Sequence, residues 1–345
     1  EKMGGKLKKQ KGQAAQAATA TPMDEEPSTS GRAYTLAIAV PGSVIEAAPS
    51  AEAAAVIAGQ IARAACIFNV DEVVVYDDSA AAGSTTNDGT ITVATATLAR
   101  LLQYLETPPW LRAALMPGAS AYPELRAADA MCSSLNSPHH TRGQEWRPYQ
   151  EGVVMRSEPG MGSFVDVGSD RNAHVSQDLP TGRRVTLHLG DSGPTASFVP
   201  AFSETMLQAR VVAPSEPRTR LGQHWGFSVR VARGLSKVVK EAPHKGGYDL
   251  TIGTSEQGVA REQSELVLPR FKRALVVFGG VQGLEEIAEN DEALAQAGKS
   301  ATDALSMYLN CVPGQGCTSI RTEDAVLVCC AYLHAAIQKY GHGAA

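Results

Sequence analysis

The chain has 345 residues, 43% of them hydrophobic, so it can bury a sizeable core, and its length favours two or three domains. The formal net charge of −5 gives no overall signature of nucleic-acid binding, although a local basic surface remains compatible with it. The six cysteines lie mostly in apolar runs without a C-x-x-C pair, which argues against a disulfide framework and against zinc. With no apolar run long enough to span a membrane and no signal peptide, we expect an intracellular protein.

The first 31 residues are rich in Lys, Gln, Ala, Ser and Pro and nearly lack large apolar side chains, which predicts a disordered tail over 1–31. Four lysines cluster within it: Lys6, Lys8, Lys9 and Lys11. Such a cluster is typical of a nuclear-localisation or nucleic-acid-binding signal, and equally of a solvated tail without a partner.

Residues 32–144 alternate between strand and helix patterns. The run TLAIAV at 35–40 predicts a buried strand, 52–68 a helix, EVVVY at 72–76 a second strand, and 94–106 a further helix. A strand–helix–strand order of this kind favours a parallel sheet with helices on its faces.

Residues 145–240 change to a period of two, in runs such as GVVMRS, RRVTLHLG and WGFSVRVA separated by turn residues, which predicts an inserted small β-barrel or sandwich. Arginines recur there among aromatic residues, as in an OB-like RNA-binding domain, although the same pattern suits aromatic core residues beneath a solvated basic face. The arginines expected to contact RNA are Arg183, Arg184, Arg218 and Arg220, together with Arg142 in the preceding loop. His139-His140 has no partner at metal-ligand spacing, so no metal is expected.

The α/β pattern returns over 241–345, where two stretches share one plan. ALVVFGGVQGLEE at 274–286 and MYLNCVPGQGCTSIRTEDAVLVCC at 307–330 each give a strand, a Gly-rich turn and a helix. Ligands of open α/β sheets bind at the carboxyl ends of such strands. Thr322 is expected to cap a helix, and Glu323 and Asp324 behind it occupy the place of a phosphate. A ligand with adenosine and no phosphate, such as S-adenosylmethionine, therefore fits better than a nucleotide, unless the glycines serve only as turns.

Several blocks of this sequence resemble SPOUT-class RNA methyltransferases, and specifically a eukaryotic and archaeal subfamily with spindle- and kinetochore-associated members. The blocks are AYTLAIAVPGS (33–43), AGQIARAACIFNVDEVVVYD (58–77), LARLLQYLETPPWLR (98–112), LNSPHHTR (135–142), APHKGGYDLTIGTSEQG (242–258), ALVVFGGVQGLE (274–285) and NCVPGQGCTSIRTEDA (310–325). The resemblance extends from about residue 32 to the last helix.

The resemblance implies an α/β fold with a SPOUT-type knotted parallel sheet, helices on both faces, and an inserted OB-like β-barrel. It also implies an S-adenosylmethionine-dependent homodimer that acts on RNA in the nucleus or nucleolus, with spindle or kinetochore association as a further expectation. Carried over by position, the cofactor-binding residues are Thr254, Phe278, Gly279, Gly280, Asn310, Pro313, Gly314, Gln315, Gly316, Ile320 and Thr322.

The implied reaction is methylation of a base in ribosomal or other structured RNA, with uridine N3 favoured. Because N3 of uracil carries a proton, a base must remove it. Glu323 and Glu256 are the candidate bases, with Arg321 orienting the substrate, although Glu323 equally suits a purely structural place at a helix terminus. A non-catalytic RNA- or spindle-associated adaptor is the alternative, and a nicotinamide-dependent oxidoreductase is disfavoured because the phosphate fingerprint is missing.

Overall fold

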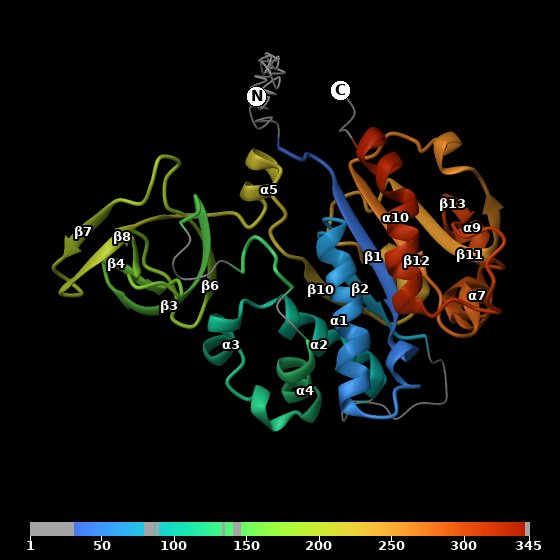
Figure 1. The fold of residues 1–345 in the computed structure, drawn as a ribbon, viewed down its shortest axis with the longest axis horizontal. Helices are drawn as coiled ribbons and strands as arrows, with labels where there is room; N and C mark the ends of the chain where they lie inside the picture. Colours follow the sequence, from blue (N-terminus) through green and yellow to red (C-terminus); the bar gives the residue numbers. More distant parts are fainter. Residues whose placement is uncertain (1–30, 79–85, 87–89, 133–134, 141–145, 342–345) are drawn as a thin grey trace, which may run out of the picture.

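The computed structural model describes residues 31–78, 86, 90–132, 135–140 and 146–341, which form two sheets with helices around the first (Figure 1). Residues 1–30 of the tail expected at 1–31 lie outside the described part, as does Arg142.

The first sheet has six strands, all parallel. In spatial order these are β10 (Ser228–Ala232), β2 (Glu72–Tyr76), β1 (Thr35–Pro41), β12 (Arg273–Phe278), β11 (Leu250–Ala260) and β13 (Met307–Asn310). The central strands β1, β2 and β12 are buried on both faces, as their near-continuous apolar runs require. Because all six strands run the same way, their carboxyl ends meet at one edge, where loops can build a site.

Alternate residues along β1 divide the hydrophobic core into two layers. Leu36, Ile38 and Val40 face the helices α1, α2, α4 and α10, whereas Ala37 and Ala39 face α6, α7, α8 and α9. The first group comprises α1 (Ala51–Ile67), α2 (Val93–Glu106), α4 (Pro123–Met131) and α10 (Thr322–Tyr340). The second comprises α6 (Leu235–Lys240), α7 (Gly283–Asn290), α8 (Glu292–Gln296) and α9 (Ala301–Ala304). The expected parallel sheet with helices on both faces is therefore confirmed.

The second sheet has seven strands, mostly antiparallel, with its own core of valine, leucine and alanine. In spatial order they are β7 (Ala196–Val199), β8 (Glu204–Gln208), β5 (Ala173–Val175), β4 (Gly162–Asp166), β3 (Tyr149–Glu158), β6 (Arg184–His188) and β9 (Arg210–Val212). We call this sheet the β domain; it projects to one side of the molecule in Figure 1.

One strand lies elsewhere than expected. The run WGFSVRVA, assigned by its alternation to the inserted β domain, supplies β10, which pairs in parallel with β2 at the edge of the first sheet. An edge strand is covered less completely than a central one, and the half-exposed pattern of β10 imitates the alternation of an antiparallel strand. The α5 helix (Glu216–Leu221) precedes it, and α3 (Pro109–Leu115) lies beneath the β domain (Figure 1).

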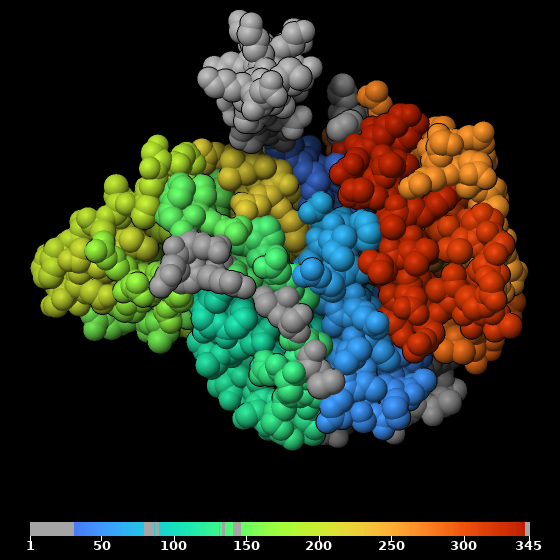
Figure 2. Space-filling view, viewed as in Figure 1, coloured from blue at the N-terminus to red at the C-terminus, as the bar shows by residue number. Residues whose placement is uncertain are grey.

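Helices from the first third and from the end of the sequence meet on one face of the molecule. In Figure 2 the surfaces of α1, from the first third of the sequence, and of α10, the last helix, adjoin each other.

No helix in the described ranges is long and apolar enough to cross a lipid bilayer.

Candidate functional site

Three loops converge at the carboxyl edge of the parallel sheet and enclose a cavity of about 190 Å³, which we call the loop pocket. One loop is the outer half of β11, the second joins β12 to α7, and the third joins β13 to α10. The residues expected to bind a cofactor that line it are Thr254, Phe278, Gly279, Gly280, Asn310, Gln315 and Ile320. The two stretches that share one plan in the sequence are thus two walls of one pocket.

Glycine is required where these loops touch. A Cβ atom at Gly258 would lie 2.3 Å from the backbone carbon of Leu309, and one at Gly279 would lie 2.7 Å from the amide nitrogen of Leu284. Neither neighbour is a flexible side-chain end that could move aside, so the backbones pack at a distance that only glycine permits.

Hydrogen bonds fasten the third loop to the other two. The Asn310 side-chain amide donates to the Glu256 carbonyl at 2.9 Å, and the Thr322 hydroxyl donates to the Gly279 carbonyl at 2.9 Å. Thr322 is therefore not the N-cap that the sequence suggested: α10 begins at Thr322 itself, after Arg321, whose side chain makes no cap bond. The hydroxyl joins two loops instead of capping its own helix.

The loop pocket carries carboxylates and, among the described residues that line it, neither lysine nor arginine. The Glu285 carboxylate accepts hydrogen bonds from Ser255 at 2.6 Å and from Tyr308 at 2.7 Å. Burial acts to raise the pKa of Glu285, but these two hydroxyl donors outweigh it and lower that pKa, so the group is held ionised. A cavity of this charge repels phosphate and suits a ligand with amine, hydroxyl and sulfonium groups.

Of the three candidate catalytic residues, only one lines the loop pocket. Glu256 lines the pocket and accepts a bond from Gln315 at 3.3 Å. Glu323 is buried outside the lining, and Arg321 is exposed, 3.5 Å from Glu323. Pro313, Gly314, Gly316 and Thr322 also lie outside the lining, although Thr322 contacts it through Gly279.

The expected cofactor-binding residues did not include Ser255 and Glu285, which also line the pocket. A signal existed for both, because Ser255 directly follows Thr254 and Glu285 ends the quoted block at 274–285.

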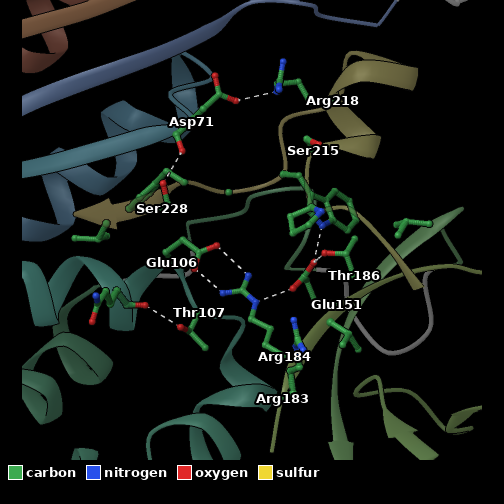
Figure 3. Close-up of a pocket in the computed structure, with 18 of the residues that line it drawn as sticks. Asp71, Glu106, Thr107, Glu151, Arg183, Arg184, Thr186, Ser215, Arg218 and Ser228 are labelled. Carbon is green, nitrogen blue, oxygen red and sulfur yellow. Dashed lines mark hydrogen bonds and ion pairs between the residues drawn. The ribbon is translucent and has the colours of Figure 1, made fainter. Parts of the chain in front are cut away.

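A larger cavity of about 720 Å³ lies where the β domain meets the parallel sheet; we call it the junction cavity (Figure 3). Arg183, Arg184 and Arg218, which were expected to contact RNA, all line it. Arg183 is exposed, whereas Arg218 hydrogen-bonds to the carbonyls of Arg32 and Tyr34 and lies 3.3 Å from Asp71. Arg220 lies outside the lining, and its guanidinium bonds Asp191 at 2.5 Å.

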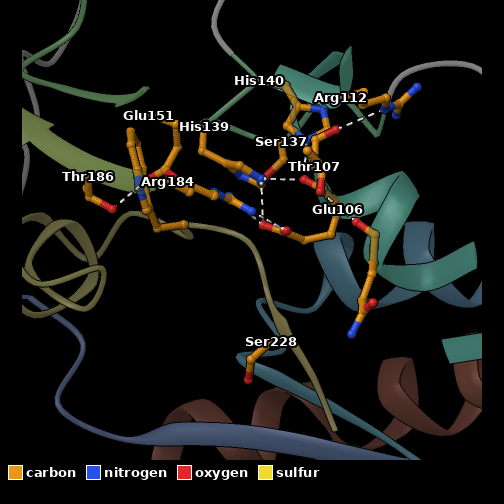
Figure 4. Close-up of polar contacts among 12 residues, drawn as sticks. Glu106, Thr107, Arg112, Ser137, His139, His140, Glu151, Arg184, Thr186 and Ser228 are labelled. Atoms are coloured by element: carbon orange, nitrogen blue, oxygen red, sulfur yellow. Dashed lines mark hydrogen bonds and ion pairs between the residues drawn. The ribbon is translucent and has the colours of Figure 1, made fainter. Parts of the chain in front are cut away.

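A network of buried polar groups crosses this junction (Figure 4). Arg184 bonds both carboxylate oxygens of Glu106 at 2.7 and 3.0 Å, and its Nε donates to Glu151 at 2.6 Å. His139 lies 3.0 Å from the Glu106 carboxylate, and the indole of Trp225 donates to Glu151 at 2.6 Å. Burial favours neutral Glu106, but Arg184 and His139 outweigh it and hold the pKa of Glu106 well below its ordinary value.

The aromatic residues of the inserted region were expected either to stack on RNA or to form core, and their burial differs from one to the next. Trp225 and Phe227 are buried, whereas Phe198 is exposed, with 62% of its surface accessible.

Among the residues in the described ranges, no cluster of three or more metal-ligating side chains occurs.

Comparison with known proteins identifies relatives of this chain. Residues 35–333 match the family described as "Putative RNA methyltransferase". The chain is 41% identical over 319 residues to the human 28S rRNA (uridine-N(3))-methyltransferase, covering 90% of this chain and 81% of that protein. It is 36% identical over 346 residues to the Drosophila melanogaster protein of the same name, covering 96% of this chain and 67% of that protein.

A solved structure, a "putative RNA methyltransferase of the TrmH family" from Porphyromonas gingivalis, is 10% identical with a TM-score of 0.30, covering 90% of this chain and 62% of that one. That score is too low to support an argument about the fold. The family match over most of the chain, together with the two relatives, is sufficient on its own: the chain belongs to this family of RNA methyltransferases.

Proposed function

We propose that this protein transfers a methyl group from S-adenosylmethionine to N3 of a uridine in large-subunit ribosomal RNA. The observation that carries the proposal is the loop pocket, built from the blocks that resemble SPOUT methyltransferases, in a chain 41% identical to a uridine-N3 methyltransferase.

The lining of the loop pocket fits this methyl donor. Backbone carbonyl and amide groups of glycine-rich loops can pair with an adenine edge, and the ionised Glu285 suits the amine or the ribose hydroxyls. The absence of lysine and arginine from the described lining counts against a dinucleotide. When bound, the donor supplies an electrophilic methyl group on a sulfonium.

The residues of the chain then have to position the uridine, exclude water from it and remove the proton from its N3. The ties from Asn310 to Glu256 and from Thr322 to Gly279 hold the three loops rigid, which fixes the geometry on which orientation effects depend. Glu256 is a candidate for accepting a proton within the pocket, whereas Glu323 and Arg321 support the start of α10.

Further parts of the proposal concern fold and assembly. The knotted arrangement of the parallel sheet that the SPOUT resemblance implies is part of the proposal. Exposed apolar residues on α10, Leu327 and Val328, together with Val281 beside the pocket, support a homodimer that covers them. An OB-like β domain that contacts RNA through exposed Arg183, and a nucleolar location, complete the proposal.

The direct test is calorimetric binding of S-adenosylmethionine, with NADH as the control ligand. Gly280→Arg should abolish binding, because a Cβ at Gly280 already lies 3.1 Å from Ser43 Oγ and 3.2 Å from Asp78 Oδ2. Methyl incorporation into unmodified large-subunit RNA, followed by nucleoside mass spectrometry, should give N3-methyluridine. Failure of the folded protein to bind the donor would overturn the proposal.

A further inference from the structure

A third cavity, of about 540 Å³, opens at the same edge of the parallel sheet as the loop pocket; we call it the outer cavity. It lies beneath the ends of β2 and β10 and is lined by Asp77, Asp78, Arg233 and Lys237, with α7 and α8 opposite. β2 and β12 are separated only by β1, so the strands whose ends border the two cavities lie about 10 Å apart, given the spacing of neighbouring strands.

Asp78 stands between the two cavities. Its carboxylate accepts hydrogen bonds from the Ser43 hydroxyl at 2.5 Å and from the Ser43 amide at 3.1 Å. The position of a Cβ on Gly280 is 3.2 Å from Asp78 Oδ2, and Gly280 lines the loop pocket. The α7 helix also joins the cavities, since Leu284 lines one and Asn290 the other, about 9 Å further along the helix.

We propose that the outer cavity receives the target uridine of the RNA, with Arg233 and Lys237 pairing its phosphates and Asp78, in place of Glu256, taking the proton from N3. This inference rests on the proposed function and names the substrate site for it.

The outer cavity is lined by four carboxylates, those of Asp77, Asp78, Asp291 and Glu292, so its two cations are the groups through which it can bind a phosphate. Within the described part of the chain, the exposed guanidinium of Arg233 has no ion-pair partner, and Lys237 has only an exposed contact with Glu241 at 3.4 Å. Among the carboxylates, Asp77 accepts from the amide of Thr92 and Asp291 from the amide of Ser236, bonds that fix their positions and leave their charge in place. Two cations thus remain available to an anionic backbone.

Asp78 has the chemistry that the proton transfer requires. The proton passes from N3 to the carboxylate, and the N–H electron pair forms the bond to the methyl carbon. The pair of the methyl–sulfur bond stays on sulfur. Burial and then the neighbouring charge of Asp77 raise the pKa of Asp78, against the lowering effect of the Ser43 bonds, which makes the carboxylate a better base. Asp77 and Tyr76 are the titratable groups that face it.

The experiment uses the full chain with an in vitro transcript of large-subunit RNA, and compares Asp78→Asn, Arg233→Ala and, as a charge-matched control, the exposed Lys299→Ala outside the cavity. Asp78→Asn should lower kcat by about 10²-fold or more while binding of S-adenosylmethionine and RNA stays within about twofold. Its residual rate should rise about tenfold per pH unit as N3 ionises, and RNA containing the more acidic 5-fluorouridine should restore it. Arg233→Ala should weaken RNA binding several-fold and reduce the salt slope by about 1, which Lys299→Ala should not do.

Three results would overturn the inference. These are an unchanged rate in Asp78→Asn, a loss of rate that neither higher pH nor 5-fluorouridine restores, and RNA binding by Arg233→Ala equal to that of the control. In each case the wild-type protein still methylates uridine, so the proposed function stands. A wild-type protein that binds the methyl donor but methylates no uridine defeats the proposed function instead, and the RNA-binding comparison of Arg233→Ala with Lys299→Ala still tests the outer cavity.

Discussion

Arg184 and Glu106 form a two-bond ion pair that joins the β domain to the end of α2, and only 7% of the surface of Glu106 is exposed. The same guanidinium also bonds Glu151. Arg184 therefore neutralises two buried carboxylates from different parts of the molecule, whatever contact it also makes with RNA.

Replacing Arg184 by Met should lower the free energy of unfolding by about 3 kcal/mol or more, because two buried carboxylates lose the guanidinium that pairs with both. Urea denaturation measures this, and the neighbouring exposed Arg183→Met should change stability by no more than about 0.5 kcal/mol. Equal stability of the two variants, with RNA affinity lost only in Arg184→Met, would contradict this role.

Acidification should destabilise the protein through its buried histidines. Burial, reinforced by the charge of His139, lowers the pKa of His224 to about 3 and that of His140 to about 4. Between these values and the ordinary value of 6.5 the unfolded chain binds protons that the folded one does not, so stability is lost as the pH falls below 6.5. Each such group contributes up to about 1.4 kcal/mol per pH unit.

His224→Leu isolates one of these two contributions. Both ring nitrogens of His224 are buried without a hydrogen-bond partner in the described structure, so removing them should reduce the slope of stability against pH between 4 and 6.5. Urea titrations at several pH values test this, and a slope identical to that of the wild-type protein would show that His224 is not buried in its neutral form.

Gly258→Ala should disrupt the loop pocket, because the new Cβ would overlap the backbone of Leu309. We expect destabilisation of about 1–3 kcal/mol and weaker binding of the methyl donor. Gly118→Ala is the matched control, since a Cβ there has no atom within 4 Å. Thermal unfolding and calorimetry of the pair separate strain at the pocket from the general effect of replacing glycine; equal behaviour would refute the close approach.

Thr322→Val should loosen one wall of the loop pocket, since the hydroxyl that bonds the Gly279 carbonyl is replaced by a methyl group of similar size. The expected cost is about 1 kcal/mol in stability, with a comparable loss in donor affinity. Thr322→Ser keeps the hydroxyl and should retain affinity. If Ser and Val at this position weaken donor binding equally, the bond between the loops is not what holds the pocket.

Local pattern predicted the central parts of this fold well. The strands expected at 35–40 and 72–76 are β1 and β2, and the helices expected at 52–68 and 94–106 are α1 and α2 to within one residue. These elements are long or fully buried, so their apolar residues recur with a clear period. The loop pocket followed because each of its glycine-rich turns comes directly after a short apolar run, although only the run in β12 is fully buried and the edge strand β13 is half-buried.

Features that depend on distant partners could not be predicted in this way. The sequence around Arg184 does not show that Glu106, from another part of the molecule, neutralises it. Nor does the sequence around Glu285 show Ser255 and Tyr308 converging on it. Which sheet β10 joins depends on its neighbour β2, and the half-buried pattern of an edge strand is compatible with either sheet.

The position of β1 in the parallel sheet has a consequence for synthesis of the protein. One edge of β1 pairs with β2, which follows closely in the sequence, but the other pairs with β12, near the far end of the chain. While the ribosome makes the β domain, β1 presents an apolar strand with an unpaired edge, the kind of surface that aggregates. Pairing across such a separation is also slow. The N-terminal half therefore needs shielding by chaperones until β12 has been synthesised.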